Sequence, residues 1–290
     1  QITQQMEDLQ KAGASIARVR ELTGIRTKLE DGTGAVLPAG PLAVEFDRVS
    51  FGYDQAEPAL RNLSFRLRPG TVLGLLGRTG SGKTTLIRLL LRLYDPARGR
   101  ICAGDGARAV DLRDVHLHDL PRHIGVVTQN VQLFNASVRD NLAFFDRSIP
   151  DERILEVLVE LGLGRWYTAL PDGLDSELAS GGAGLSAGEG QLLAFARIFL
   201  KDPGLVILDE ASSRLDPATE QLIERAVERL VRHRTAIIIA HRLKTVERAD
   251  EIMILDHGRI LEHGSRDALA DDPGSQFAAL LRTGIEEVLA

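Results

Sequence analysis

The chain has 290 residues, enough for one large domain or two small ones, and its 44% hydrophobic and 26% charged residues are typical of a globular protein. A net charge of −6 argues against a nucleic-acid partner, and a single cysteine, Cys102, excludes a disulfide framework or a cysteine-based zinc site and fits a reducing compartment. No stretch approaches the roughly 20 apolar residues of a membrane span, and no signal peptide is visible. Because the sequence begins with Gln1 rather than Met, we expect a fragment of a longer protein.

Residues 1–24 are expected to form an amphipathic helix that ends at Gly24. Two interpretations stay open: a surface helix packed on its own domain, or the cytoplasmic end of a helix that arrives from a membrane domain. A linker rich in glycine and proline follows at 25–41, so the compact domain is expected to begin near Leu42 and to cover 42–290. The apolar positions of the helix recur at three- and four-residue steps and are Ile2, Met6, Leu9, Ile16, Val19 and Leu22.

From residue 42 onward, short apolar runs alternate with helical patterns. Continuous apolar runs are typical of strands that are covered on both faces, which predicts a mostly parallel sheet flanked by helices. A helix is expected at 84–93, and the block from about 130 to 200 is expected to be a helical subdomain inserted into the α/β core. Strands are expected at 44–51, 63–67, 71–76, 124–127, 205–208 and 236–240, with a late hairpin at 252–255 and 259–262.

The segment Gly-Arg-Thr-Gly-Ser-Gly-Lys-Thr at 77–84 fits the phosphate-binding pattern G-x-x-x-x-G-K-[ST] in full. It follows an expected strand and opens an expected helix, which makes a chance glycine-rich turn the weaker interpretation. Lys83 is expected to reach the β- and γ-phosphates, and the Thr84 hydroxyl to bind Mg²⁺. The candidate nucleotide-binding residues of this segment are Gly77, Thr79, Gly80, Ser81, Gly82, Lys83, Thr84 and Thr85.

Two further strands end in residues suited to ATP hydrolysis. Asp209 and Glu210 close the run 205–208; many strands end in a solvated acid, but beside a phosphate loop Asp209 is expected to hold Mg²⁺ and Glu210 to orient the attacking water. His241 follows the next apolar run. A lone histidine is often structural, but a polar side chain at a strand's carboxyl end faces the ligand crevice of an open α/β sheet.

An ordered set of motifs over residues 43–285 resembles the ABC ATPase family. The set comprises an aromatic loop with Tyr53, which the resemblance places against adenine, a glutamine loop with Gln129, the signature Leu-Ser-Ala-Gly-Glu at 185–189, an aspartate loop at 213–216 and the switch histidine His241. The resemblance also implies that Gln129 touches Mg²⁺ and senses the transmembrane domains.

The family implies a P-loop NTPase core with an antiparallel β subdomain besides the helical one. Residues 133–142 are similar to the exporter pattern, as is a helix preceding the ATPase domain; an importer ATPase subunit is the alternative. The resemblance implies ATP and Mg²⁺ as ligands, and two kinds of partner: a second ABC ATPase domain, identical or different, and the transmembrane domain of the same transporter. The implied location is the cytoplasmic face of the inner membrane.

Three positions depart from the family pattern. Ala187 replaces the first glycine of the signature L-S-G-G-Q, Glu189 replaces its glutamine, and Ser180 stands where exporters carry a glutamate. An acidic Glu189 near a phosphate would be repulsive unless it points away or pairs with a base. Ser186 and Gly188, which the family places nearest the partner's γ-phosphate, are kept.

The resemblance implies composite sites, in which the signature residues Ser186, Gly188 and Glu189 complete the ATP site of a second domain. Rival interpretations are a soluble ABC ATPase that acts on nucleic acid or ribosomes, a P-loop GTPase and a non-catalytic nucleotide sensor. The acidic charge disfavours the first, the absence of any Asn-Lys pair disfavours the second, and Glu210 with His241 disfavours the third.

Overall fold

The computed structural model describes residues 29–53, 57–128, 131–179, 185–209, 216–239 and 246–283, together with 13, 15–20 and 23–24. The chain divides into two units, 1–31 and 32–290. In the first unit the described residues up to 24 are helical, and the other positions of the expected helix 1–24 lie outside the described residues. None of the described helices combines the length and the hydrophobicity that a membrane span requires.

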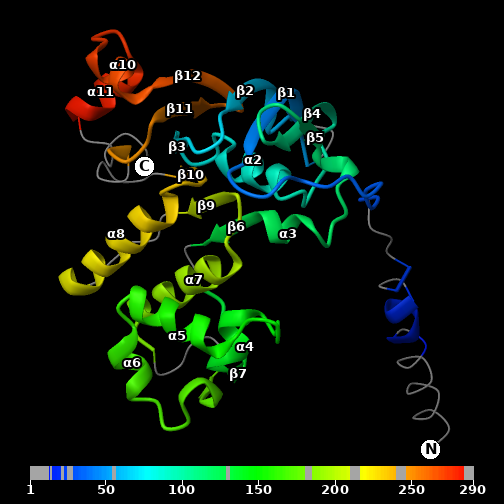
Figure 1. Ribbon diagram of the computed structural model, residues 1–290. Helices are drawn as coiled ribbons and strands as arrows, with labels where there is room; N and C mark the ends of the chain where they lie inside the picture. The colour runs from blue at the N-terminus through cyan, green and yellow to red at the C-terminus, as the bar shows by residue number, and fades with distance from the viewer. Residues whose placement is uncertain are drawn as a thin grey trace, which may run out of the picture. The chain divides into compact units, whose positions relative to one another are not determined.

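A six-stranded sheet forms the centre of the second unit, in the order β12-β11-β3-β10-β9-β6 (Figure 1). Its strands pair in parallel except for β12, which is antiparallel to β11. The expected parallel sheet and late hairpin are therefore confirmed. The strands are β3 (Val72–Leu76), β6 (Ile124–Val127), β9 (Leu205–Asp209), β10 (Thr235–Ile239), β11 (Glu251–Asp256) and β12 (Arg259–Ser265).

The central strands are apolar on both faces because each face packs on a different core. In β9, Val206 and Leu208 join a core with the helical part of the chain, whereas Leu205 and Ile207 join a core with the antiparallel sheet. Alternate residues of a strand point to opposite faces, so burial of both faces requires an unbroken apolar run.

A second, antiparallel sheet packs on the second of these cores in the order β2-β1-β4-β5. Helix α2 (Lys83–Leu90) contributes its apolar side to the same core, and Figure 1 shows it among these strands. The apolar pattern of the sequence predicted β1 and part of β2, but no strand at β4 or β5. The strands are β1 (Ala43–Phe51), β2 (Leu60–Leu67), β4 (Arg98–Gly104) and β5 (Ala109–Asp111).

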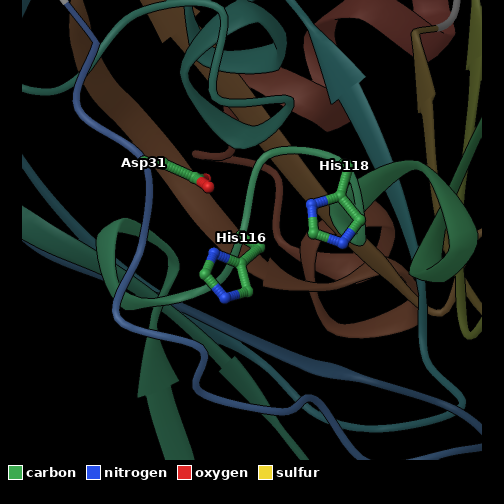
Figure 2. A group of neighbouring side chains, drawn as sticks. All are labelled: Asp31, His116 and His118. Atoms are coloured by element: carbon green, nitrogen blue, oxygen red, sulfur yellow. The ribbon is translucent and has the colours of Figure 1, made fainter.

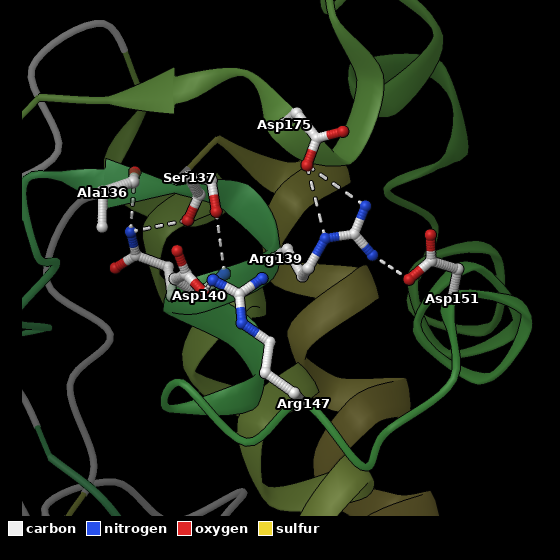
Figure 3. Close-up of polar contacts among 8 residues, drawn as sticks. Ala136, Ser137, Arg139, Asp140, Arg147, Asp151 and Asp175 are labelled. Atoms are coloured by element: carbon white, nitrogen blue, oxygen red, sulfur yellow. Dashed lines mark hydrogen bonds and ion pairs between the residues drawn. The ribbon is translucent and has the colours of Figure 1, made fainter.

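The expected helical subdomain is confirmed, and helices account for most of its structure. Arg139 links three of its elements through ion pairs with Asp151 and with Asp175, the latter 3.2 Å away (Figure 3). The elements are β7 (Ala136–Ser137), α4 (Val138–Ala143), α5 (Asp151–Glu160), α6 (Gly164–Thr168), η2 (Gly173–Asp175), β8 (Glu177–Leu178) and α7 (Ala187–Lys201).

The remaining helices connect or flank the two sheets. Helix α8 contributes Ile223 and Leu230 to the core of the helical part, and α11 contributes Phe277. These helices are η1 (Leu112–Asp114), α3 (Leu120–His123), α8 (Pro217–Val231), α10 (Arg266–Asp271) and α11 (Gln276–Thr283).

The segment 32–42 before β1 has no regular secondary structure but packs on the core of the second unit. Leu37 is 2% exposed and belongs to the core beneath the antiparallel sheet. The amides of Gly34 and Ala35 both donate to the carbonyl of Asp114, at 3.0 and 2.9 Å. Just beyond Asp114, the rings of His116 and His118 stack with their centroids 5.3 Å apart (Figure 2).

Candidate nucleotide site

Four parallel strands bring the candidate site residues to one edge of the central sheet. Ile239 of β10 is in register with Leu75 of β3 on one side and with Asp209 of β9 on the other, and Val127 of β6 pairs with Leu208. The carboxyl ends of β3, β6, β9 and β10 therefore coincide, and the loop that starts at residue 77 leaves from this edge.

Three expected hydrolysis residues come within two residues of these strand ends. Gln129 comes two residues after β6, Glu210 directly after β9, and His241 two residues after β10. All three lie outside the described residues, as does Ser180. Their roles stay predictions, but the strands that lead to them end side by side.

The phosphate loop has the backbone conformation that its glycines permit. Gly77, Gly80 and Gly82 have φ values of 144°, 81° and 110°, which side chains with a Cβ rarely adopt. A Cβ at Gly77 would also lie 2.3 Å from the carbonyl oxygen of Leu255 on β11. Glycine is thus required here both by the turn and by the neighbouring strand.

The Lys83 side chain folds back over this loop. Its Nζ donates to the carbonyl of Gly77 and, at 3.0 Å, to the carbonyl of Arg78. The ammonium group therefore lies over the cradle in which a phosphate would be bound, close to the N-terminus of α2. This arrangement fits a phosphate ligand, since an anion there would meet a cation and a helix N-terminus together.

The electrostatics of Lys83 favour an anionic ligand as well. Burial lowers its pKa from 10.5, and the charge of Asp209 partly offsets this by raising it. A desolvated ammonium gains more from a phosphate than a solvated one does. Thr84 is exposed, as a metal-binding hydroxyl requires, whereas Thr85 is buried.

A cavity of about 430 Å³ adjoins the loop. Its walls are the phosphate loop, the β11–β12 turn and α11. From the loop it is lined by residues 77–81, including the Ser81 side chain, which is 3% exposed.

Tyr53, the expected adenine platform, is hydrogen-bonded to α2, the helix that starts at the phosphate loop. Its hydroxyl lies 3.2 Å from the Thr85 hydroxyl and accepts a hydrogen bond from Arg88 at 3.0 Å. Its ring meets Phe51 and Tyr94 edge to face, at 5.1 and 5.2 Å between centroids. Tyr94, which the sequence analysis did not single out, is as exposed as Tyr53 and extends the aromatic surface.

The signature segment forms the N-terminus of α7. Ser186 is its N-cap: its hydroxyl accepts a hydrogen bond from the Glu189 amide at 3.2 Å, and the Glu189 carboxylate accepts from the Ser186 amide at 2.8 Å. Glu189 also accepts a hydrogen bond from the Ser186 hydroxyl at 2.9 Å. This capping box turns the acidic side chain back onto its own helix, where the dipole stabilises it.

Gly188 lies where α7 packs closely against α8. A Cβ at Gly188 would lie 2.0 Å from Cγ2 of Thr219. Asp216 caps α8 by accepting hydrogen bonds from the amides of Ala218 and Thr219. Its pKa is lowered first by a hydrogen bond from the Thr219 side chain and then by these amide bonds. Among the described residues, no hydrogen bond or ion pair links the signature to the phosphate loop.

The helical part carries an exposed aromatic cluster that the sequence analysis did not assign to a site. We call Phe134, Phe144 and Phe145 the aromatic patch; all three rings are exposed and contact one another through Phe134, at 5.9 and 5.5 Å between centroids. Phe134 lies within the segment 133–142 that resembles exporters, which was the available signal.

The family model described as ABC transporter matches residues 60–213, a span that holds the phosphate loop, Asp209 and the signature. The chain belongs to the ABC transporter family. ATP binding and ATPase chemistry are general to the ATP-binding domains of ABC transporters. The comparisons therefore confirm the family and the P-loop fold that the sequence predicted.

Relatives of this chain include a flippase and an import protein by name. It is 38% identical over 275 residues to an ATP-dependent lipid A-core flippase of Alcanivorax borkumensis, covering 94% of this chain and 47% of that protein. It is 41% identical over 244 residues to the mycobactin import ATP-binding/permease protein IrtA of Mycobacterium tuberculosis, covering 84% and 28%.

A solved structure of a bacterial Atm1-family ABC exporter with ATP bound superposes with a TM-score of 0.81 at 33% identity, covering 94% of this chain and 47% of that one. The chain thus spans less than half of the relatives that it matches.

Proposed function

We propose that this chain is the ATP-hydrolysing domain of a membrane exporter and that it works as one of a pair. The observation that carries the proposal is the shared edge of β3, β9 and β10, which gathers the phosphate loop, Asp209 and the chain leading to His241 around Lys83. An ATPase site needs these groups within reach of one triphosphate.

Each group has a distinct role in this proposal. Lys83 leaves the carbonyls of Gly77 and Arg78 to bind the β- and γ-phosphates, and the loop amides hold the remaining phosphate oxygens. Glu210 orients the attacking water and accepts its proton, while His241 contacts the γ-phosphate. Thr84, Gln129 and Asp209 would hold Mg²⁺, which neutralises charge that develops on the phosphates.

The second half of each site comes from another ATPase domain. Ser186 and Gly188 at the N-terminus of α7 would face the γ-phosphate that is bound to the partner, because a helix N-terminus favours an anion. Glu189 already lies at this terminus, so its charge weakens the contact with phosphate. A pairing with a different ATPase domain that carries a stronger signature is therefore the alternative to a homodimer.

The test is ATP hydrolysis measured against protein concentration, with size-exclusion chromatography of Glu210→Gln in ATP and Mg²⁺. If two copies form composite sites, the rate of ATP hydrolysis should rise faster than linearly with protein concentration, and the variant should form an ATP-dependent dimer. Lys83→Met is the control, since it should remove binding and dimer together. ATP binding without turnover, and without a dimer at any concentration, would contradict the homodimer and leave the pairing with a different domain.

The proposed membrane partner is the transmembrane domain of the same transporter, which would place this chain at the cytoplasmic face of the membrane. The exposed aromatic patch supports such a partner, because large exposed apolar clusters mark interaction sites. In this proposal the chain 1–24 is the helix that leads from that domain, and 25–41 is the linker.

Export is proposed because the Atm1-family neighbour is named an exporter. The mycobactin protein is named for import, so the direction of transport needs its own measurement on the full-length transporter.

Docking at the aromatic patch is tested with Phe144→Ser. This variant should leave hydrolysis by this chain alone unchanged and reduce hydrolysis by the full-length transporter in proteoliposomes. Equal hydrolysis by variant and parent in proteoliposomes would contradict docking at the patch.

A further inference from the structure

Arg197, in the middle of α7, is a buried cation. Arg197 is 8% exposed, and no carboxylate of the described residues lies within ion-pairing distance of it. Burial lowers its pKa to about 10, so it stays charged at neutral pH. A buried charge is costly, and an apolar side chain of similar size would fill this space with less desolvation.

The Arg197 guanidinium joins α7 to the segment that follows Gln129. Its Nε donates to the carbonyl of Asn141 at 2.8 Å, one terminal nitrogen to the carbonyl of Gln132 at 2.8 Å, and the other to the Asn141 side-chain oxygen at 3.1 Å. The planar guanidinium makes these bonds from three different nitrogens, whereas an ammonium would have to make them all from one.

Asn141 extends this connection to the loop that carries Phe134. It is 1% exposed, and its side-chain oxygen accepts a hydrogen bond from the Phe134 amide at 2.8 Å. Its side-chain nitrogen donates to the carbonyls of Phe134, Ala136 and Ser137 at 3.0, 3.2 and 3.1 Å. Figure 3 shows Ala136 and Ser137 beside the start of α4. The buried Asn141 side chain thereby connects α4 to the backbone of the loop 134–137.

The aromatic patch completes the arrangement. The guanidinium carbon of Arg197 lies 4.7 Å from the ring centroid of Phe144 and 5.9 Å from that of Phe134. Both distances are within the range of cation–π attraction. Phe134 and Phe144 stay exposed whereas Arg197 is buried, so Arg197 contacts the patch from its buried side.

We propose that Arg197 is a positioning residue that makes α7 and the segment 131–145 move as one body. When Ser186 binds a partner's ATP, α7 moves toward it. The aromatic patch then moves with α7, because hydrogen bonds link Arg197 to Asn141 and Asn141 to Phe134. This inference rests on the proposed function, since it needs an ATP that engages the signature. It adds a residue on the route by which that engagement reaches the exposed face.

The test is amide hydrogen exchange in the Glu210→Gln background, with and without ATP and Mg²⁺, on peptides that cover 131–145. ATP should slow exchange in this segment by roughly fivefold or more, within the range of ordinary coupling between sites. Arg197→Met should abolish that slowing while the ATP-dependent dimer still forms. Arg197→Lys keeps the charge but not the fork, and should lose most of the slowing, which covers the case in which Arg197→Met does not fold.

Lys201→Met is the matched control on the same helix. Lys201 donates to the carbonyl of Ile124 at 3.2 Å, at the start of β6 rather than in the segment 131–145. The Lys201→Met variant should keep the full ATP-dependent slowing of exchange in 131–145. Loss of the slowing in both variants would mean that removal of any cation from α7 disturbs the segment, and this result would overturn the specific role of Arg197.

Two further outcomes separate this inference from the proposed function. If ATP closes the dimer but leaves exchange in 131–145 unchanged in the parent, or if Arg197→Met keeps the slowing, the role of Arg197 is wrong and the ATPase proposal stands. If ATP closes no dimer, the homodimeric proposal fails, and the Arg197 assignment in this chain fails with it.

Discussion

The side-chain hydroxyl of Tyr53 lies 3.2 Å from that of Thr85, which directly follows the phosphate-loop motif 77–84. Arg88, one turn further along α2, donates to the same Tyr53 oxygen. The residue expected to hold adenine is thus hydrogen-bonded to the helix that starts at the loop expected to hold phosphate. A nucleotide that binds both would find its two contact regions already positioned.

Replacement of Tyr53 separates the ring from the hydroxyl. Tyr53→Ala should weaken ATP binding by about 1–3 kcal/mol, which is typical for loss of an aromatic platform under a base. Tyr53→Phe keeps the ring, so its ATP affinity should stay within about threefold of the parent (~0.7 kcal/mol). Isothermal titration calorimetry checks both. Equal losses for the two variants would show that the hydroxyl, rather than stacking, matters.

The capping box predicts the effect of the unusual glutamate in the signature. Glu189→Gln keeps a side chain that can accept the Ser186 amide but removes a negative charge beside the expected γ-phosphate. ATP-dependent dimer formation by Glu210→Gln should strengthen by roughly fivefold, or about 1 kcal/mol, when this change is added.

Sedimentation equilibrium of the two variants measures that difference, and urea unfolding serves as its control. Thermodynamic stability should change by less than about 0.5 kcal/mol, because the cap is preserved. A weaker dimer would mean that the Glu189 carboxylate contributes a favourable contact instead of repulsion.

Gly188 combines a packing requirement with an expected contact to phosphate, and a pair of substitutions distinguishes the two. Gly188→Ala should destabilise the fold by about 1–3 kcal/mol, because its Cβ would overlap Cγ2 of Thr219. Adding Thr219→Ala removes that methyl group and should restore most of the loss in thermal unfolding.

The repaired double variant should still form the ATP-dependent dimer poorly if Gly188 faces the partner's γ-phosphate. A dimer of normal strength would mean that Gly188 is glycine only for its packing against α8. Thr219→Ala alone provides the reference for both measurements.

Leu37 tests how far the folded domain extends toward the N-terminus. Leu37→Ala should lower the free energy of unfolding by about 2–4 kcal/mol, as for other buried leucines. Its neighbour Val36 is 81% exposed, so Val36→Ala should change it by less than about 0.5 kcal/mol. Denaturant unfolding distinguishes them, and equal effects would show that the segment before β1 does not contribute to the domain.

The sequence by itself determined the phosphate loop, the family and most strands of the central sheet. These features depend on local chemistry: residues 77–84 need glycines and a lysine in a fixed order, and strands such as β9 and β10 need unbroken apolar runs because both of their faces are buried. The acidic pair Asp209 and Glu210 and the histidine His241 became informative only through their order after those strands.

The tertiary structure decided what depends on contacts between distant segments. Strands β4 and β5 have few buried residues of their own, and β4 is defined by its pairing with β1. Leu37 lies in a segment without periodicity, so only its packing shows that it is core. Only the geometry of the first turn of α7 shows that Glu189 caps its own helix. Arg197 lies 56 residues from Asn141 along the chain, so no local pattern could reveal their bond.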